Sequence, residues 1–168
     1  MYQQDWTQQW AIYRPYHIAI KDYDSQRSVT YLQLNQLANR LTHHLHQAYE
    51  IGKGDRIALL MENSLEHVIL FVAAQKLGCV LVPFNFRLAP PEINYLLENA
   101  KPQLLIYEAA YQSILKKCPA FEHIPHQLTL SDLSAICTPQ TQLPEDEKGV
   151  CNFFFTISVR GLLQMTLW

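Results

Sequence analysis

Residues 52–83 of the chain read GKGDRIALLMENSLEHVILFVAAQKLGCVLVP, and this segment has the pattern of a strand, a helix and a second strand. A turn cluster at 52–55 precedes an almost wholly apolar run at 56–61, which has the length of a strand buried on both faces. Ser64 is placed to cap a helix over residues 65–77, and Gly78 follows that helix directly. A second apolar run then ends at Pro83. The segment therefore predicts a strand, a crossover helix and a parallel strand.

The same alternation continues on both sides of this segment. Upstream, apolar residues recur at three- and four-residue spacing over residues 34–48, which predicts a one-sided helix. Downstream, two prolines at 90–91 open another helix, and residues 103–107 read as a third strand. We therefore predict an α/β fold within residues 1–118, a partial doubly wound and mostly parallel sheet with flanking helices. Residues 119–148 are rich in Pro, Thr, Gln and Ser, and we predict an irregular connection there.

Composition excludes several classes of protein. The chain has 168 residues, 13 basic and 15 acidic side chains, a formal net charge of −2 and 49% hydrophobic residues. The apolar content excludes a disordered chain, and the near-neutral charge offers no basic face for a nucleic acid. Four cysteines, spaced 39, 19 and 14 residues apart, match neither a zinc pair nor a disulfide framework. The first ten residues do not resemble a secretory signal, so a cytoplasmic protein is expected.

The charged residues stop before the chain does. All 15 acidic residues lie at or before Glu147, and Arg160 carries the only charge after Lys148. The residues of 149–168 are mostly apolar, but Arg160 and Gly161 interrupt the run, so a membrane-spanning helix is not favoured. We interpret 149–168 as an apolar tail of doubtful native character.

Local motifs supply no catalytic centre. The sequence has no GxGxxG after its first strand, no GxxxxGK[ST] and no GxSxG. His43 and His46 lie one helical turn apart but lack a nearby Cys or carboxylate, so no metal site is predicted. Glu62, Glu66 and His67 follow the first of these strands, at the edge where open parallel sheets bind ligands. Helix capping and solvation are sufficient to explain them.

Three stretches resemble the motifs of one enzyme family. They are VTYLQL at 29–34 with NRL at 39–41, GKGDRIALLMENS at 52–64, and QKLGCVLVPFNFRLAPPEI at 75–93. The family motifs read T-Y-x-E-L, N-R-L, G-D-R-V-A-x-x-x-x-N-S and K-x-G-x-x-x-V-P-x-N-x-R-L-x-x-x-E-I. In this order and spacing, the chain is similar to the beginning of the AMP-forming acyl-CoA synthetases, the adenylate-forming superfamily of AMP-dependent synthetases and ligases.

The resemblance implies the first part of the large amino-terminal domain of these ligases. Such enzymes use ATP and Mg²⁺ to activate a carboxylic or fatty acid as an acyl-adenylate, and then form a thioester with coenzyme A. Their phosphate loop reads approximately Y-T-S-G-T-T-G-x-P-K-G, whereas residues 154–161 here read FFTISVRG. The resemblance makes Thr156 a remnant of that loop and places Arg87, the arginine of N-x-R-L, near a phosphate of coenzyme A. No catalytic residue is expected, because the lysines of the family are missing.

We therefore predict an amino-terminal piece of an acid–CoA ligase, ended by a frameshift or similar lesion near Lys148. Alone it is expected to be inactive and to bind no ATP, Mg²⁺ or coenzyme A productively. Its incomplete sheet leaves an open edge, which favours self-association or aggregation. One alternative is a non-catalytic interaction module that docks through its open sheet or its apolar tail. A free-standing nucleotide binder is a further alternative.

Overall fold

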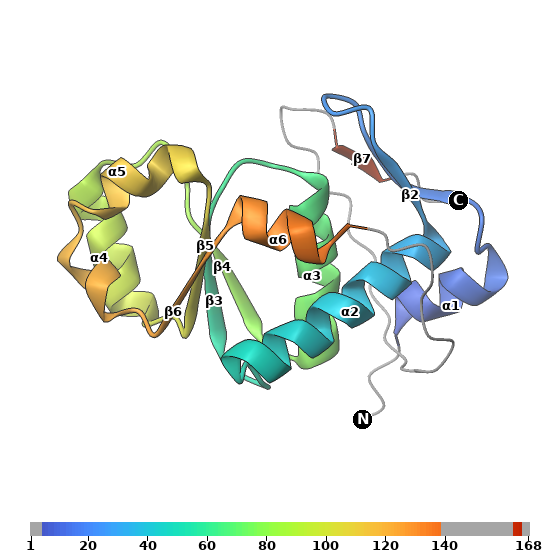
Figure 1. Ribbon diagram of the computed structural model, residues 1–168, viewed down its shortest axis with the longest axis horizontal. Coiled ribbons are helices and arrows are strands. Elements are labelled where there is room, and N and C mark those ends of the chain that lie inside the picture. Colours follow the sequence, from blue (N-terminus) through green and yellow to red (C-terminus); the bar gives the residue numbers. More distant parts are fainter. Residues whose placement is uncertain (1–4, 139–162, 166–168) are drawn as a thin grey trace. The chain divides into compact units, whose positions relative to one another are not determined.

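The computed structural model describes residues 5–138 and 163–165, and these form two compact units (Figure 1). Unit 1 comprises residues 1–43, 63–76 and 137–168, and unit 2 comprises residues 44–62 and 77–136. The helices are α1 (Trp6–Tyr13), α2 (Tyr31–Tyr49), α3 (Leu65–Leu77), α4 (Pro90–Ala100), α5 (Gln112–Leu115) and α6 (Leu130–Ile136), with 3₁₀ turns η1 (Ala109–Tyr111) and η2 (Pro119–His123). The strands are β1 (Ile18–Asp22), β2 (Ser28–Thr30), β3 (Arg56–Leu60), β4 (Val80–Pro83), β5 (Leu104–Tyr107), β6 (His126–Thr129) and β7 (Leu163–Met165).

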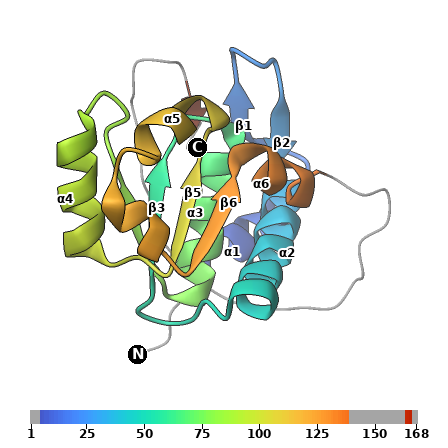
Figure 2. The same cartoon turned by 60° about the vertical axis from the view of Figure 1, so that its left-hand side comes forward.

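Unit 2 contains a four-stranded parallel sheet with the order β4-β3-β5-β6. Figure 2 labels three of these strands, β3, β5 and β6. Strands β3 and β5 lie at its centre, and every residue of 57–60 and 104–107 is buried. Burial on both faces explains why these strands are continuous apolar runs in the sequence, without polar alternation. The predicted α/β fold with a parallel sheet and flanking helices is confirmed.

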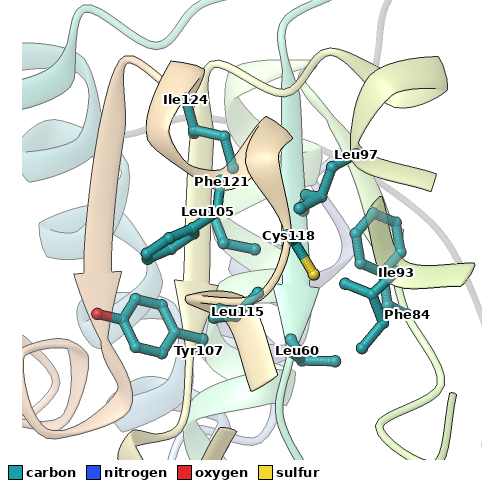
Figure 3. Close-up of a cluster of buried hydrophobic side chains, with 11 residues drawn as sticks. Leu60, Phe84, Ile93, Leu97, Leu105, Tyr107, Leu115, Cys118, Phe121 and Ile124 are labelled. Carbon is teal, nitrogen blue, oxygen red and sulfur yellow. The ribbon is translucent and has the colours of Figure 1, made fainter. Parts of the chain in front are cut away.

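One face of this sheet carries the core of unit 2 (Figure 3). Alternate residues of β3 and β5 point to the same face of a sheet, so Leu60 and Leu105 lie in one cluster. Helix α4 contributes Ile93 and Leu97, Phe84 comes from the segment after β4, and the segment after β5 contributes the remaining side chains that cover this face. The whole cluster consists of Ala58, Leu60, Phe84, Ile93, Leu97, Leu105, Tyr107, Leu115, Cys118, Phe121 and Ile124.

The predicted irregular connection is wrong over the part that the structure describes. Residues 119–138 contain η2, the fourth sheet strand β6 and helix α6. Strand β6 is only four residues long and only Leu128 in it is buried, so it has too few apolar positions for a visible alternation. Its place is fixed by parallel pairing to β5, in the register Ile106 with Leu128. Residues 139–148, and all of the tail except 163–165, lie outside the described part of the chain.

Helix starts follow capping rules that the sequence carries. Thr30 and Gln33 form a reciprocal capping box at α2: the Thr30 N–H donates to Gln33 Oε1 (2.9 Å) and the Gln33 N–H donates to Thr30 Oγ1 (3.3 Å). At α3 the His67 N–H donates to Ser64 Oγ (3.2 Å), so the predicted cap is confirmed. Gly78 ends α3 with φ +73°, a conformation that favours glycine.

Unit 1 is held by two ion pairs with buried carboxylates. The Lys76 ammonium binds Asp5, which also accepts the Gln8 N–H (3.0 Å) as the cap of α1. The Arg27 guanidinium binds Glu66 through two hydrogen bonds of 2.6 and 3.0 Å. In the same unit, β1 pairs antiparallel with β2 on one side and β7 on the other. No helix within residues 5–138 is long and apolar enough to cross a bilayer.

Both outer edges of the unit 2 sheet contain a position that a further strand cannot use. On the β4 edge, the Val80 N–H donates to the Asp55 carbonyl and the Phe84 N–H donates to the Leu59 carbonyl. Backbone N–H groups alternate in direction along a strand, so the backbone nitrogen of Pro83 faces away from β3, and proline has no N–H to donate there. At the other edge, the Thr129 N–H donates to Asp132 Oδ2 (3.3 Å). These features oppose strand addition. Self-association of the chain nevertheless stays a prediction.

Replacing Pro83 by valine is expected to increase self-association, because it restores an outward-facing donor on β4. Sedimentation velocity over a concentration series measures the share of species larger than the monomer. Pro119→Val, which lies outside any strand and starts η2, is the matched control. Identical distributions for the two variants would show that Pro83 does not protect this edge.

Candidate functional site

The most suitable place for a ligand in unit 2 is the edge where the parallel strands end. Strand β4, the next strand along the chain, pairs with one side of β3, and the strand after it, β5, pairs with the other side of β3. The strand order therefore reverses between β3 and β5, and open α/β sheets bind ligands in the crevice beyond the carboxyl ends of such strands. Glu62 follows β3 and Glu108 follows β5, so two carboxylates occupy this position.

Direct hydrogen bonds hold the two carboxylates at this edge. The Glu62 N–H donates to Glu108 Oε1 (2.5 Å), which links the segments that follow β3 and β5. The Tyr111 hydroxyl donates to Glu62 Oε1 (3.1 Å). Desolvation, this hydrogen bond and the charges of both carboxylates raise the pKa of Tyr111 to about 12. The phenol therefore stays protonated at neutral pH, as a hydrogen-bond donor.

This geometry does not suit a phosphate. Backbone N–H groups and cations bind phosphates, whereas here one strand-end N–H is already used by Glu108 and the side chains carry negative charge. A nucleotide bound against Glu62 and Glu108 would meet like-charge repulsion. The hydrogen bonds of Glu62 and Glu108 can order the loops at the sheet edge, and the carboxylates can accept hydrogen bonds from a ligand. They cannot form a phosphate cradle.

Arg87 lies at the same edge, on the segment that follows β4. Its N–H donates to Asn85 Oδ1 (3.0 Å), and its guanidinium carbon lies 5.5 Å from the centre of the Phe86 ring. Phe86 in turn stacks on Tyr111, with ring centres 5.8 Å apart and an interplanar angle of 29°. The structure therefore brings Arg87 close to the Tyr111–Glu62 pair through one aromatic contact.

The Arg87 guanidinium is available for an anion. Its side chain is exposed, and it forms no ion pair with a carboxylate of residues 5–138 or 163–165. A cation–π contact orients a guanidinium without neutralising its charge. The other site residue that the sequence suggested, Thr156, lies outside the described residues.

Two other residues suggested by the strand end serve local structure. Glu66, in the first turn of α3, is only 3% exposed, and its carboxylate binds Arg27 rather than a ligand. The His67 N–H is used in the cap of α3.

His46 Nδ1 lies 3.1 Å from the Ile51 carbonyl oxygen, a contact within unit 2. Among the described residues, no group of three or more His, Cys, Asp or Glu side chains could hold a metal.

The cysteines that the structure describes are poor nucleophiles. Cys79, Cys118 and Cys137 are not in disulfide bonds. Burial raises the pKa of Cys79 to about 11 and that of Cys137 to about 12, and it also raises the pKa of Cys118. Because the thiolate is the reactive species, these three side chains are inert at neutral pH.

Glu108 and Tyr111 are the site residues that the sequence analysis did not identify. A usable signal exists for the first, because Glu108 directly follows the predicted strand at 103–107 in the same way that Glu62 follows the strand at 56–61. Applying the strand-end rule to both strands would have found the pair. No local signal exists for Tyr111, whose contact with Glu62 spans 49 positions of sequence.

Comparison with known proteins places these features in a family context. The family model described as "AMP-binding enzyme" matches residues 7–154. The chain is 44% identical over 101 residues to the long-chain-fatty-acid–CoA ligase FadD13 of Mycobacterium tuberculosis H37Rv, which covers 60% of this chain and 20% of the relative. It is 34% identical over 127 residues to the crotonobetaine/carnitine–CoA ligase of Salmonella paratyphi C, covering 76% of this chain and 23% of the relative.

Solved structures give the same picture. The N-terminal domain of FACL13 from Mycobacterium tuberculosis matches with a TM-score of 0.73 and 33% identity, over 89% of this chain and 39% of that one. The O-succinylbenzoate coenzyme A synthetase MenE from Bacillus subtilis, solved with AMP, matches with a TM-score of 0.67 and 27% identity, over 86% of this chain and 35% of that one. The chain spans about a fifth of the length of the curated relatives it matches.

Proposed function

The chain belongs to the AMP-binding enzyme family, and from this premise we propose that it is the amino-terminal part of an acid–CoA ligase. The observation that carries the proposal is the match to the family over residues 7–154, together with the parallel sheet of unit 2. The family uses ATP, and its curated relatives are ligases that act on carboxylic acids. The proposed parent reaction joins a carboxylic or fatty acid to coenzyme A through an acyl-adenylate.

The described residues do not fit ATP or its magnesium ion. The carboxyl edge of the sheet presents Glu62 and Glu108, which repel phosphates, and the described part of the chain contains no group of three or more side chains suited to a metal. The family resemblance places the phosphate loop around Thr156, and the family match ends at residue 154. No catalytic step is assigned to the described residues.

Arg87 does fit a single phosphate of coenzyme A. It is exposed, it is unpaired within the described residues, and the Phe86 ring orients it. A guanidinium can bind a phosphate through two parallel hydrogen bonds. We therefore keep Arg87 as a contact for coenzyme A in the complete ligase, with Tyr111 and Phe86 as the groups that position it.

The chain alone is expected to show no ATP–pyrophosphate exchange with any carboxylic acid, because the described residues form no cradle for the phosphates. The assay follows radioactive pyrophosphate into ATP, with fatty acids of several chain lengths. The FadD13 ligase of Mycobacterium tuberculosis, measured in parallel, shows that the assay works. Exchange by the chain above the buffer blank would contradict the proposal.

Arg87 can be tested on the chain itself by titration with coenzyme A. Binding through one exposed cation is expected to be weak, in the millimolar range, and Arg87→Gln should weaken it up to about fivefold, since an exposed ion pair contributes at most about 1 kcal/mol. Nuclear magnetic resonance shifts of the arginine Nε–H groups measure binding at each position. Lys117→Gln removes an equal charge from an exposed position and is the control. Equal effects of both variants would remove Arg87 from the site.

The alternative of an interaction module gains support from one observation. Seven large hydrophobic side chains of the described residues are exposed, and four of them lie within residues 12–18 of unit 1. This segment is neither the open sheet edge nor the apolar tail. The alternative of a free-standing nucleotide binder has no such support, because carboxylates occupy the crevice of the sheet.

A further inference from the structure

Unit 2 contains a cavity at the amino ends of its strands, at the opposite edge of the sheet from Glu62 and Glu108. The cavity has a volume of about 500 Å³ and lies between the end of α4 and η2. Gln103 and Pro125, which precede β5 and β6, belong to its wall. Cavities of about 300–1,000 Å³ are the usual size for small-molecule ligands. The amino edge of the sheet is therefore a second place where unit 2 can hold a ligand.

The inner wall of the cavity is apolar. Leu97 and Ile124 are 2% and 8% exposed, and they lie at the upper end of the core cluster in Figure 3. Pro102, which is also buried, and the half-buried Ala120 belong to the same wall. These side chains offer no hydrogen bond, so the wall favours the apolar part of a ligand. In such a cavity, specificity depends on the few polar groups around the apolar wall.

Lys101 is the cation of the cavity, and its backbone is fixed. Its N–H donates to the Leu97 carbonyl (2.9 Å) at the end of α4, and its own carbonyl accepts a hydrogen bond from Arg56 Nη2 (3.4 Å). The Lys101 side chain is exposed, and it forms no ion pair with a carboxylate of residues 5–138 or 163–165. The ammonium can therefore bind an anion without a change in the backbone that carries it.

Glu98, the carboxylate of the same wall, has a different partner. Its Oε1 accepts a hydrogen bond from Asn94 Nδ2 (2.8 Å), one helical turn earlier on α4. Asn94 Oδ1 in turn accepts the Ala120 N–H (2.9 Å), which links α4 to η2. These bonds draw Glu98 towards the amino end of α4, and no ion pair joins it to Lys101. The charge of Lys101 is therefore not neutralised by its neighbour.

The turn η2 forms the facing wall of the cavity. His123 Nδ1 lies 3.1 Å from the Pro119 carbonyl oxygen, which can only accept a hydrogen bond, so Nδ1 carries the hydrogen. This contact holds the ring in one orientation. Because the histidine brings no negative charge, it does not oppose an anion in the cavity.

We propose that this cavity binds a small carboxylic acid as its carboxylate, with the apolar body of the acid against Leu97 and Ile124 and the carboxylate on the Lys101 ammonium. The apolar body is removed from water by the wall, and a charge-assisted hydrogen bond fixes the headgroup. An amine of the same shape would be repelled by Lys101. The inference is independent of the acid–CoA ligase function, because it uses no residue of the carboxyl edge and requires neither ATP nor coenzyme A.

Titration of the full chain with 3-phenylpropanoate tests the proposal, with nuclear magnetic resonance shifts of the backbone amides as the measurement. Binding is expected in the millimolar range, because an exposed ion pair contributes little. Amides of residues 97–103 and 119–125 should shift together, and those of residues 108–111 should not shift. The probes 3-phenylpropan-1-ol and 3-phenylpropylamine have the same apolar body. The alcohol should bind about threefold more weakly than the acid, and the amine about tenfold more weakly.

Two variants with opposite expected effects sharpen the test. Lys101→Gln keeps an unbranched side chain at the same backbone position (φ +45°) and should weaken binding of the acid about threefold. Glu98→Gln keeps an oxygen for Asn94 and should strengthen binding about twofold, because it removes a negative charge from the wall. Lys117→Gln removes an exposed charge outside the cavity wall and should leave binding unchanged.

Thermal unfolding followed by circular dichroism confirms that the three variants fold. The proposal is overturned if the acid and the amine bind equally, or if the acid shifts no amides of the cavity wall. It is also overturned if Lys101→Gln and Lys117→Gln have the same effect on the affinity.

Discussion

Lys76→Met is expected to lower the free energy of unfolding of unit 1 by about 3–5 kcal/mol, the usual cost of breaking a buried ion pair by removing one partner. The Lys76 side chain is 9% exposed and that of Asp5 is 3% exposed. The ammonium binds both Asp5 and the amide oxygen of Asn35 (2.8 Å). Methionine fills a similar volume but leaves the Asp5 carboxylate buried without a counter-charge, and it leaves Asn35 without this donor.

A double variant separates the unpaired charge from lost packing. Asn caps a helix about as well as Asp, so Asp5→Asn keeps the bond from the Gln8 N–H while removing the charge. If the unpaired carboxylate causes most of the loss, Lys76→Met with Asp5→Asn should be more stable than Lys76→Met alone by about 1–2 kcal/mol, the cost of an unsatisfied charged group. Urea denaturation followed by circular dichroism measures both. A double variant as unstable as the single one would assign the loss to packing of the lysine stem.

The ion pairs of unit 1 show where sequence reasoning stops. Asp5 and Lys76 are separated by 71 positions, and Arg27 and Glu66 by 39. The sequence predicts Glu66 as an acid favoured by the start of a helix, and Glu66 does lie in the first turn of α3, but the prediction does not identify Arg27 as its partner. Local patterns carry no information about which distant cation a buried carboxylate will meet, because that depends on how the elements pack.

Strands and helices were predictable where local signals agree. Residues 52–83 combine a turn cluster, two apolar runs, a serine cap and a terminal glycine, and the structure has β3, α3 and β4 there. Strand β6 has no such agreement of local signals, because Leu128 is its only buried residue. Its strand conformation depends on the parallel pairing with β5. Helix α1 was also missed: in the sequence, residues 6–13 have no continuous apolar face, and Asp5 was not identified as a cap.

The candidate site was predictable in part for the same reason. Glu62 and Arg87 follow strands that the sequence reveals, so their place at the carboxyl edge of the sheet followed from the fold. Their connection through Tyr111 and Phe86 could not be predicted, because it depends on η1 bringing Tyr111 back over the sheet edge. The prediction that the chain holds no catalytic residue rests on missing motifs and stays a prediction. What the structure adds at this edge is the hydrogen bond from the Glu62 N–H to the Glu108 carboxylate.

Leu97→Ala is expected to destabilise unit 2 by about 3 kcal/mol, through lost apolar burial and the cavity it leaves. Leu97 is 2% exposed and faces the core cluster from α4, between the sheet and the segment that contains Phe121 and Ile124 (Figure 3). A domain of this size is stable by only about 5–15 kcal/mol, so such a loss removes a large share of it.

The adjacent residue provides the control for this variant. Leu96 lies on the same helix and is partly buried against the edge of the same cluster, so Leu96→Ala changes the helix propensity by the same amount but empties much less space. We expect it to cost about 1 kcal/mol, in proportion to the smaller buried area. Hydrogen exchange of the β3 and β5 amides gives the local free energy of opening in both variants. If Leu96→Ala and Leu97→Ala lower the protection of β5 equally, α4 does not cover the sheet as the structure shows. If only Leu97→Ala lowers it, the core beneath α4 stabilises unit 2 as the structure shows.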